Sequence, residues 1–334
     1  MSYNAPMDKV EKFKNAKYVF VVGIGGSDLA SKAVWSALTL HRSEVSKKLF
    51  FLEAPDSREY AEVDHFINDV VADIAEVALV VVSKSGETVE TLETYHKTFD
   101  MLSEKFGAPV TERVLVASTP GGHLWKLAES KNIEKIAWEG DVGGRFSAFT
   151  APHLAILEIA GLDTSSFLKA KDSADKDRAE NLAKEIFDNY KKGADILDFF
   201  IFNSELEDLG KWSRQLIAES LATLTPTVSI GPTDLHSMLE LYLERPGSRF
   251  TIFVKSEKEI GGSVNQQSFE NITAEYKQRN LPLFIYSMSQ IDEYEVGKFM
   301  SFMFEVTLSL AKLLGVNPFD QPEVENYKKS ILNP

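Results

Sequence analysis

Two short segments rich in glycine and hydroxyl side chains follow apolar runs and precede stretches that favour helix. They are GIGGSDL at residues 23–29 and SKSGETVET at residues 83–91. The N-terminus of a helix offers unpaired backbone N–H groups to a phosphate, and serine and threonine hydroxyls add further donors. The first segment has Asp28 where a dinucleotide fingerprint needs its third glycine, and neither segment carries the Gly-Lys-Ser/Thr of a P-loop. The pair predicts a sugar phosphate, bound without nucleotide machinery.

The groups that would hold this phosphate follow from the two segments. The first offers the bare backbone around Gly26 and the Ser27 hydroxyl, although a turn that needs glycine only for its geometry remains an alternative. The second offers three hydroxyls and one ammonium group, from Ser83, Ser85, Thr88 and Lys84. Helix capping explains one hydroxyl, but not three beside a lysine. We therefore expect the two turns to hold one phosphate at the same end of the sheet.

A carboxylate suited to proton transfer lies further along the chain. Gln215 and Glu219 are four residues apart in a predicted helix over 207–223, so they share one helix face. Leu216 and Ile217 lie beside them, and a carboxylate partly shielded by apolar neighbours can serve as a base near neutral pH. An exposed helical glutamate is the alternative, and this helix alone favours that alternative.

The elements that position these residues alternate along the chain. Eight apolar runs are typical of buried strands, at 18–22, 49–53, 77–83, 113–118, 196–203, 225–230, 249–256 and 281–287. Helical patterns lie at 90–106, 163–193, 207–223, 234–244 and 294–314. This alternation predicts an α/β fold with two doubly wound parallel sheets, each covered by helices on both faces. Ligands of such sheets bind beyond the carboxyl ends of the strands, which is where the candidate turns lie.

The pattern also divides the chain into four parts. We expect a first α/β subdomain over 1–160 and a bridging helix over 161–195, whose charged stretch is interpreted as a solvated helix face. We expect a second subdomain over 196–316 and a C-terminal helical segment over 317–334.

Composition narrows the class of protein. The 334 residues include 44% hydrophobic residues, enough for a large core, and carry a formal net charge of −14. That charge disfavours nucleic acid and anionic membranes as partners, so a phosphorylated substrate needs a locally positive pocket. The chain has no cysteine, which leaves no disulfide framework and no thiolate metal site. The first residues do not resemble a signal peptide, and no apolar run approaches the roughly 18 residues of a membrane span, so we expect a soluble cytoplasmic protein.

Five segments, in order, resemble the phosphoglucose isomerase family of the sugar isomerase (SIS) superfamily. They are the two turns, GDVGGRFS at 140–147, RQLIAES at 214–220 and NPFDQPEVENYK at 317–328, so the resemblance spans about residues 18 to 330. It implies two SIS subdomains, each a three-layer α/β/α sandwich. It also implies reversible aldose–ketose isomerisation of glucose 6-phosphate and fructose 6-phosphate through a cis-enediol(ate), in glycolysis and gluconeogenesis. This chemistry requires no redox cofactor and no metal.

The resemblance implies a role for each matching residue. Glu219 corresponds to the base that moves a proton between C1 and C2, with Gln215 beside it. Arg145 corresponds to the arginine that stabilises the enediolate. His236, in GPTDLHSM, corresponds to the histidine of ring opening, and Lys328 to the lysine that assists it.

Further matches concern binding and support. Ser27 corresponds to the first substrate loop, residues 83–88 to the phosphate loop, and Gln321 to the segment that carries the lysine. Glu90 occupies the position of a buried acid near the arginine and the phosphate loop. Five other histidines, among them His153, match no site motif and are interpreted as structural.

The resemblance also implies a homodimer in which the ring-opening histidine reaches the site of the partner. The long helix predicted over 294–314, rich in phenylalanine and methionine, suggests the same, because it carries more apolar surface than one half of the chain readily covers. The chain is shorter than typical members, and we expect the helical extension before the first strand to be missing. A bifunctional phosphoglucose/phosphomannose isomerase and a non-catalytic sugar-phosphate sensor remain alternatives. A sensor of this kind usually carries a DNA-binding domain, and the sequence has neither a basic patch nor a spare helix-turn-helix segment.

Overall fold

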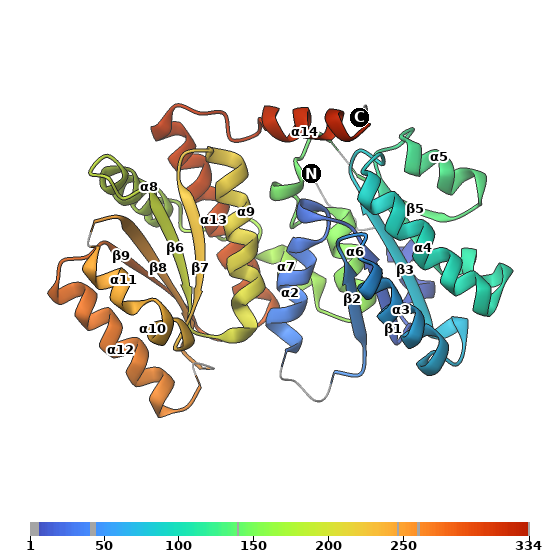
Figure 1. Cartoon of the computed structure of the whole chain (residues 1–334), viewed down its shortest axis with the longest axis horizontal. Helices are drawn as coiled ribbons and strands as arrows, with labels where there is room; N and C mark the ends of the chain where they lie inside the picture. Colours follow the sequence, from blue (N-terminus) through green and yellow to red (C-terminus); the bar gives the residue numbers. More distant parts are fainter. Residues whose placement is uncertain (1–6, 41–44, 139, 246, 259–260, 333–334) are drawn as a thin grey trace. The chain divides into compact units, whose positions relative to one another are not determined.

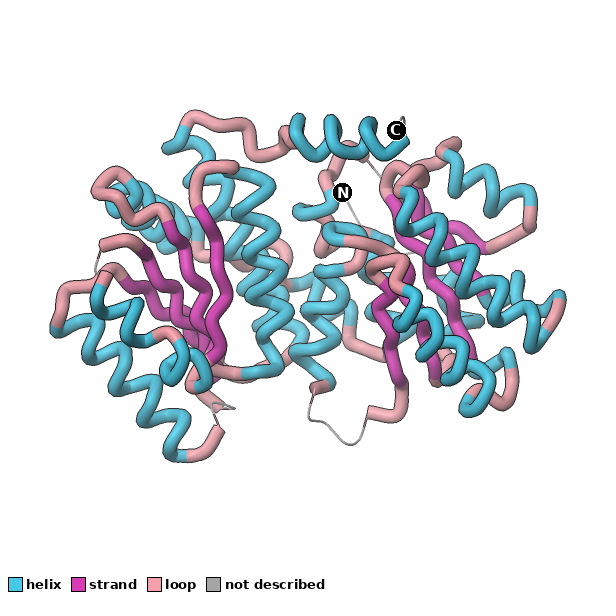
Figure 2. Tube along the Cα trace, viewed as in Figure 1, coloured by secondary structure: helices cyan, strands magenta, loops and turns pink. Residues whose placement is uncertain are grey.

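The structure is a computed structural model that describes residues 7–40, 45–138, 140–245, 247–258 and 261–332. It contains two compact units (Figure 1). Unit 1 comprises Met1–Trp35 and Arg42–Thr164, and unit 2 comprises Ser36–His41 and Ser165–Pro334. Each unit holds one parallel sheet with helices packed against it (Figure 2). The predicted α/β class with two doubly wound parallel sheets is confirmed.

The sheet of unit 1 has five strands in the order β2-β1-β3-β4-β5. Their bounds are β1 Tyr18–Val22, β2 Lys48–Leu52, β3 Val77–Ser83, β4 Val114–Ser118 and β5 Glu134–Ala137. The α-helices are α1 Met7–Val10, α2 Leu29–Thr39, α3 Ser57–Val70, α4 Val89–Phe106, α5 His123–Ser130 and α6 Ala151–Ala160. Short 3-10 helices are η1 Glu11–Phe13, η2 Gly25–Ser27, η3 Ile74–Glu76, η4 Ala108–Arg113 and η5 Gly144–Phe146.

Side chains of β1 alternate between two separate cores, which explains why the whole strand is apolar. Phe20 and Val22 join a core with α3, α4 and α5. Val19 and Val21 join a second core on the other face, with α1 and α6. Because both faces of the sheet are covered, every position along a central strand has to be apolar.

The sheet of unit 2 has four strands in the order β7-β6-β8-β9. Their bounds are β6 Ile196–Ile201, β7 Thr225–Ile230, β8 Arg249–Ser256 and β9 Leu283–Met288. The helices are α7 Thr164–Lys169, α8 Lys176–Tyr190, η6 Ser204–Leu206, α9 Glu207–Leu221, α10 Thr233–Ser237, α11 Leu239–Glu244, α12 Ser263–Gln278, α13 Glu293–Leu314 and α14 Pro322–Leu332. An aromatic core that includes Phe200, Phe253 and Tyr276 fills the face under α11 and α12, and α13 packs along α8 and α9.

Much of the apolar surface of α13 is covered inside unit 2. Phe299, Met300 and Met303 are fully buried, and Phe302 is 2% exposed. The helices α8 and α9 and the strand β9 cover these side chains, while Leu313 near the end of α13 is 41% exposed. The inference that this helix has apolar surface left for a second subunit stays a prediction.

Three segments differ from the sequence-based expectation. The short strand β5 was not predicted, because its four residues, EKIA, alternate in charge and do not form an apolar run. The stretch 163–193 forms two helices, and the Asp175 side chain caps the second by accepting from the Arg178 N–H at 3.0 Å. The stretch 234–244 also forms two helices, α10 and α11.

The predicted four-part division of the chain stays a prediction. No helix in the described ranges combines the length and apolar character that crossing a membrane would need.

Candidate active site

The two phosphate-binding candidates lie at the same edge of the unit 1 sheet. β1 pairs with β2 on one side and with β3 on the other, and Val22 is in register with both Leu52 and Val81. The winding of the sheet therefore reverses between β1 and β3, and the turns that follow these two strands open at this switch point. The sequence-based prediction that both turns share one sheet end is confirmed.

The second turn is organised as a hydroxyl-lined loop at the start of α4. The Ser83 hydroxyl accepts from the Gly86 N–H at 3.1 Å and lies 3.1 Å from the Thr88 hydroxyl. Thr88 occupies the N-cap position of α4 but makes no side-chain capping hydrogen bond. The first N–H groups of this 18-residue helix consequently have no side-chain cap from that residue, which suits them to an anionic ligand. The Ser85 hydroxyl is exposed beside them.

A neighbouring turn braces this loop. The Thr119 hydroxyl donates to the Lys84 carbonyl at 2.7 Å. Gly86 has a φ of +68°, and a Cβ there would lie 2.9 Å from the Ser118 hydroxyl, so only glycine fits. The loop is thus held in one shape by the end of β4.

The first turn packs directly against the turn that carries Arg145. A Cβ built on Gly26 would lie 2.5 Å from the carbonyl carbon of Gly144 and 2.8 Å from the Arg145 nitrogen. The two backbones therefore touch, and residue 26 must be glycine. Arg145 itself, in η5, is only 3% exposed. Unit 1 thus brings the Ser27 turn and Arg145 together, although they lie in separate sequence motifs.

His153 lies buried beside both of these turns. Its Nε2 atom is 2.9 Å from the Ser147 hydroxyl and 3.2 Å from the Gly26 carbonyl, and its Nδ1 atom is 3.3 Å from the Ser31 hydroxyl. Burial lowers the pKa of His153 to about 4, opposed by the contact with Gly26. The imidazole is therefore neutral around pH 7. The sequence alone does not indicate that His153 lies beside the site, because this residue stands in an apolar helix outside every motif.

Asp28 follows the Ser27 turn and is fully buried. Burial, together with the neighbouring Glu53 carboxylate, raises the pKa of Asp28 well above its usual value. Glu53 in turn forms an ion pair with Lys32, at 3.0 Å. The shift favours the uncharged acid, which limits the negative charge next to a turn that is a candidate for binding a phosphate dianion.

The proton-transfer candidates lie on α9 in unit 2. The side-chain amide of Gln215 donates to the Glu219 carboxylate at 3.0 Å. Both side chains are half-buried, and Leu216 and Ile217 beside them are fully buried. Glu219 is therefore an oriented and partly shielded carboxylate, in contrast to the exposed helical glutamate that the sequence left as an alternative.

His236 is exposed on α10, and its helix begins directly after β7. The Asp234 carboxylate accepts from the Ile230 N–H at 2.7 Å and from the Ser237 hydroxyl at 2.8 Å, which ties the end of β7 and the last residue of α10 to one side chain. The following helix, α11, is anchored by the Tyr242 hydroxyl, 2.6 Å from the Ser229 hydroxyl of β7.

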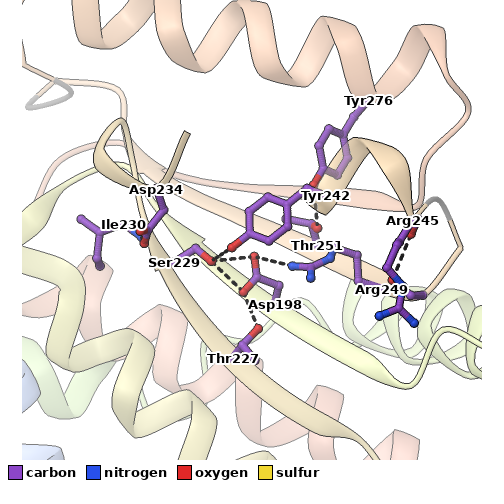
Figure 3. A network of polar contacts seen from close by, with 11 residues as sticks. Asp198, Thr227, Ser229, Ile230, Asp234, Tyr242, Arg245, Arg249, Thr251 and Tyr276 are labelled. Carbon is purple, nitrogen blue, oxygen red and sulfur yellow. Dashed lines mark hydrogen bonds and ion pairs between the residues drawn. The ribbon is translucent and has the colours of Figure 1, made fainter. Parts of the chain in front are cut away.

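A buried carboxylate lies at the centre of that anchor (Figure 3). Asp198 on β6 accepts from the hydroxyls of Thr227 at 2.5 Å and Ser229 at 3.0 Å, and one oxygen lies 3.8 Å from the Arg249 guanidinium. That guanidinium lies 3.9 Å from the centre of the Tyr242 ring, close enough for a cation–π contact. Burial raises the pKa of Asp198, while the Thr227 hydroxyl and Arg249 oppose the shift. The network joins three strands to the helix that follows His236.

The remaining predicted residues lie around α14 and in the first turn of α4. Gln321 is half-buried just before α14. Lys328 lies within α14, and its side chain is outside the described part of the structure. Glu90, in the first turn of α4, is partly exposed, so the burial that the resemblance implied for it is not found. Across the described ranges, no three histidine, aspartate or glutamate side chains gather in a way that could hold a metal ion.

Two doubly wound α/β units, with a hydroxyl-lined turn at the switch point of the first, define a protein of the sugar isomerase fold class. The sequence model of the family described as phosphoglucose isomerase matches residues 6–196, more than half of the chain. The chain belongs to the phosphoglucose isomerase family.

Individual relatives agree with this family. A glucose-6-phosphate isomerase of Clostridioides difficile is 30% identical over a match that covers 96% of this chain and 81% of that protein. A glucose-6-phosphate isomerase of Methanocaldococcus jannaschii is 28% identical over a match that covers 98% of this chain and 86% of that protein. The crystal structure of a glucose-6-phosphate isomerase from Chlamydia trachomatis gives a TM-score of 0.82 at 19% identity, over 97% of this chain and 71% of that one. At that identity the structural likeness shows a shared fold.

Proposed function

We propose that the chain is a glucose-6-phosphate isomerase that interconverts glucose 6-phosphate and fructose 6-phosphate through a cis-enediol(ate). The observation that carries the proposal is the half-buried Glu219 carboxylate held by Gln215, at 3.0 Å. Membership of the family and the hydroxyl-lined turn at α4 support a phosphosugar as substrate. A soluble enzyme of this kind would act in the cytoplasm.

The proposed chemistry assigns one step to each group. His236 and Lys328 exchange protons with the ring oxygen and O1 while the ring opens. Glu219 then takes the proton from C2, and the electron pair moves to give the enediolate. The Arg145 guanidinium, 3% exposed, stabilises the negative charge on the enediolate oxygens, where low exposure strengthens the interaction. Glu219 finally returns the proton to C1, so the carboxylate is regenerated and no redox partner is consumed.

We also propose a homodimer in which His236 serves Glu219 of the second copy. Within unit 2, α9 begins at the edge of the sheet where β6 ends, and Glu219 lies twelve residues into that helix, about 18 Å along its axis. β7 then returns across the sheet, so α10 lies at the opposite edge from the end of α9 (Figure 1). His236 is exposed there, together with Met238 and Leu241, 36% and 41% exposed. This separation within one unit supports a histidine supplied by a partner.

A coupled assay tests the proposed activity. Fructose 6-phosphate is supplied, and glucose 6-phosphate is detected through NADPH formed by glucose-6-phosphate dehydrogenase. We expect steady NADPH production that depends on the protein. Binding of fructose 6-phosphate without turnover would instead identify a sugar-phosphate sensor. Mannose 6-phosphate is supplied in a second assay, with commercial glucose-6-phosphate isomerase added so that any fructose 6-phosphate formed is detected in the same way. Turnover of mannose 6-phosphate as well would identify a bifunctional enzyme.

The double variant Ser85→Ala/Thr88→Ala tests the phosphate loop. Each lost hydrogen bond to a charged group costs about 1.5–3 kcal/mol, so we expect KM for fructose 6-phosphate to rise roughly 100-fold or more. The value of kcat at saturation should change little, because the phosphate is bound equally in the ground state and the transition state.

The matched control for this variant is Thr111→Ala/Ser130→Ala. It removes the same two kinds of hydroxyl, whose hydrogen bonds go to the Ala108 and Leu127 carbonyls at 3.1 and 2.8 Å, away from the loop. KM should stay within about twofold in this control, since exposed surface substitutions have small effects. An unchanged KM in the test variant would remove the loop from the binding site.

A further inference from the structure

One buried imidazole contacts both turns that meet beside Arg145. His153 reaches the Gly26 turn through the Gly26 carbonyl, at 3.2 Å, and the η5 turn through the Ser147 hydroxyl, at 2.9 Å. His153 and Ser147 are both fully buried. Gly26 and Ser147 lie 121 residues apart in the chain, so these contacts bridge two distant segments.

The contacts fix where the imidazole proton lies. The Gly26 carbonyl can only accept a hydrogen bond, so Nε2 is the nitrogen that carries the proton. The Ser147 hydroxyl lies 2.9 Å from Nε2, 2.5 Å from the Gly144 carbonyl and 3.2 Å from the Gly26 carbonyl. These polar contacts link His153 through Ser147 to Gly144, the residue immediately before Arg145.

One direct side-chain contact also crosses the junction, since the Ser147 hydroxyl lies 3.2 Å from the Gly26 carbonyl. At Gly26 and Gly144 the junction is backbone against backbone, and glycines contribute no side chain that could interlock the two turns. Glycine also loses the most conformational freedom when it is ordered, so such a junction needs specific restraints. A neutral imidazole supplies a directional restraint without placing charge beside the arginine.

We propose that His153 is a positioning residue that holds the Gly26 turn and the Arg145 turn in one fixed relation. The role in catalysis rests on the proposed function of Arg145 in stabilising the enediolate. Because that charge develops only in the transition state, loss of the restraint should lower kcat by a larger factor than it raises KM. A residue that served stability alone would not produce this split.

His153→Leu removes the polar contacts with both turns, and the Nδ1 contact with the Ser31 hydroxyl, while keeping an apolar side chain of similar size. We expect kcat to fall about 10- to 100-fold with KM changed by less than about threefold, because a misplaced catalytic group can cost up to roughly 100-fold. His153→Gln should recover most of the rate, since its amide N–H can occupy the place of Nε2–H. Ser147→Ala, which removes only the hydroxyl between the imidazole and Gly144, should show the same kcat loss to a smaller degree.

The control is Ile156→Ala, on the same helix, whose fully buried side chain packs in the sheet core and has no polar contact with the turns. It should lower the melting temperature but leave kcat within about twofold at temperatures where it is folded, because a core cavity acts mainly on stability. Loss of kcat in this control equal to that in His153→Leu would overturn the proposal.

Hydrogen–deuterium exchange separates the proposal from the function on which it rests. In His153→Leu, amides of both turns, residues 24–28 and 143–147, should exchange faster while the strands of the sheet keep their protection. Unchanged exchange in either turn, in both His153→Leu and Ser147→Ala, would refute the positioning role. If both turns loosen but Arg145→Ala keeps full activity, the assignment of Arg145 fails and the catalytic part of the proposal fails with it.

Discussion

Glu219→Gln is expected to lower kcat by more than about 10⁴-fold, beyond the usual contribution of a single acid–base group, because one carboxylate performs both proton transfers. The amide has nearly the same shape, and its oxygen can still accept from Gln215, so the local geometry is preserved. KM for fructose 6-phosphate should change little, since the phosphate contacts lie on other elements. The coupled assay measures kcat, and solvent deuterium incorporation at C2 of glucose 6-phosphate reports the proton transfer directly.

Glu207→Gln is the matched control for this prediction. Glu207 lies on the same helix, and its carboxylate pairs with Lys211 at 2.9 Å. This pair is largely exposed, so its loss should cost at most about 1 kcal/mol of stability and leave kcat unchanged. Activity of Glu219→Gln within tenfold of the unmodified protein, with the fold intact by circular dichroism, would assign the base to another residue.

The fold could be predicted from the sequence because its strands are buried on both faces. A strand such as β3, fully buried along its length, has to be apolar throughout and is therefore visible as a run. The edge strand β5 escaped prediction because an edge strand needs fewer buried positions. The split between α10 and α11 at Met238 also has no marker in the sequence, since neither glycine nor proline stands there.

The candidate site could be predicted only where all the residues of a motif lie in one short segment of the chain. The hydroxyls of residues 83–88 and the Gln215–Glu219 pair are local patterns, and the structure gives both a local hydrogen bond. The contact between Gly26 and Gly144 depends on how two distant turns pack together, and the sequence of neither turn predicts that packing. His153 has its hydrogen-bond partners only because the two turns pack together.

The Asp198 network shows the same limit inside a single sheet. In the sequence, Asp198 is one acid within an apolar run, ILDFFI, with no sign of how its charge is compensated. Its partner Thr227 becomes a neighbour only through the parallel register of β6 and β7, which places the two residues opposite each other. Register is set by the packing of whole faces, so it cannot be deduced from either strand alone.

Mixing Glu219→Gln and His236→Ala subunits is expected to restore activity that each variant lacks by itself. If His236 serves the partner's Glu219, a heterodimer has one site with both residues altered and one site with both intact. Random exchange of equal amounts gives heterodimers as half of the population, so the mixture should recover about a quarter of the unmodified activity, by the symmetry of a two-site dimer. Each homodimer alone should be reduced by at least about 10²-fold, the lower end for loss of an acid–base group.

The control mixture is Glu219→Gln with Glu219→Ala. It exchanges subunits in the same way but cannot form an intact site under any arrangement, so its activity should stay at the level of the homodimers. Native mass spectrometry, with one variant isotopically labelled, measures the fraction of heterodimer. Complete exchange without recovery in the test mixture would mean that His236 acts within its own chain, and α10 would then have to approach α9 despite lying at the opposite edge of the same sheet. Full activity of the unmodified protein as a monomer at low concentration would exclude a shared site, because no partner would be present to supply the histidine.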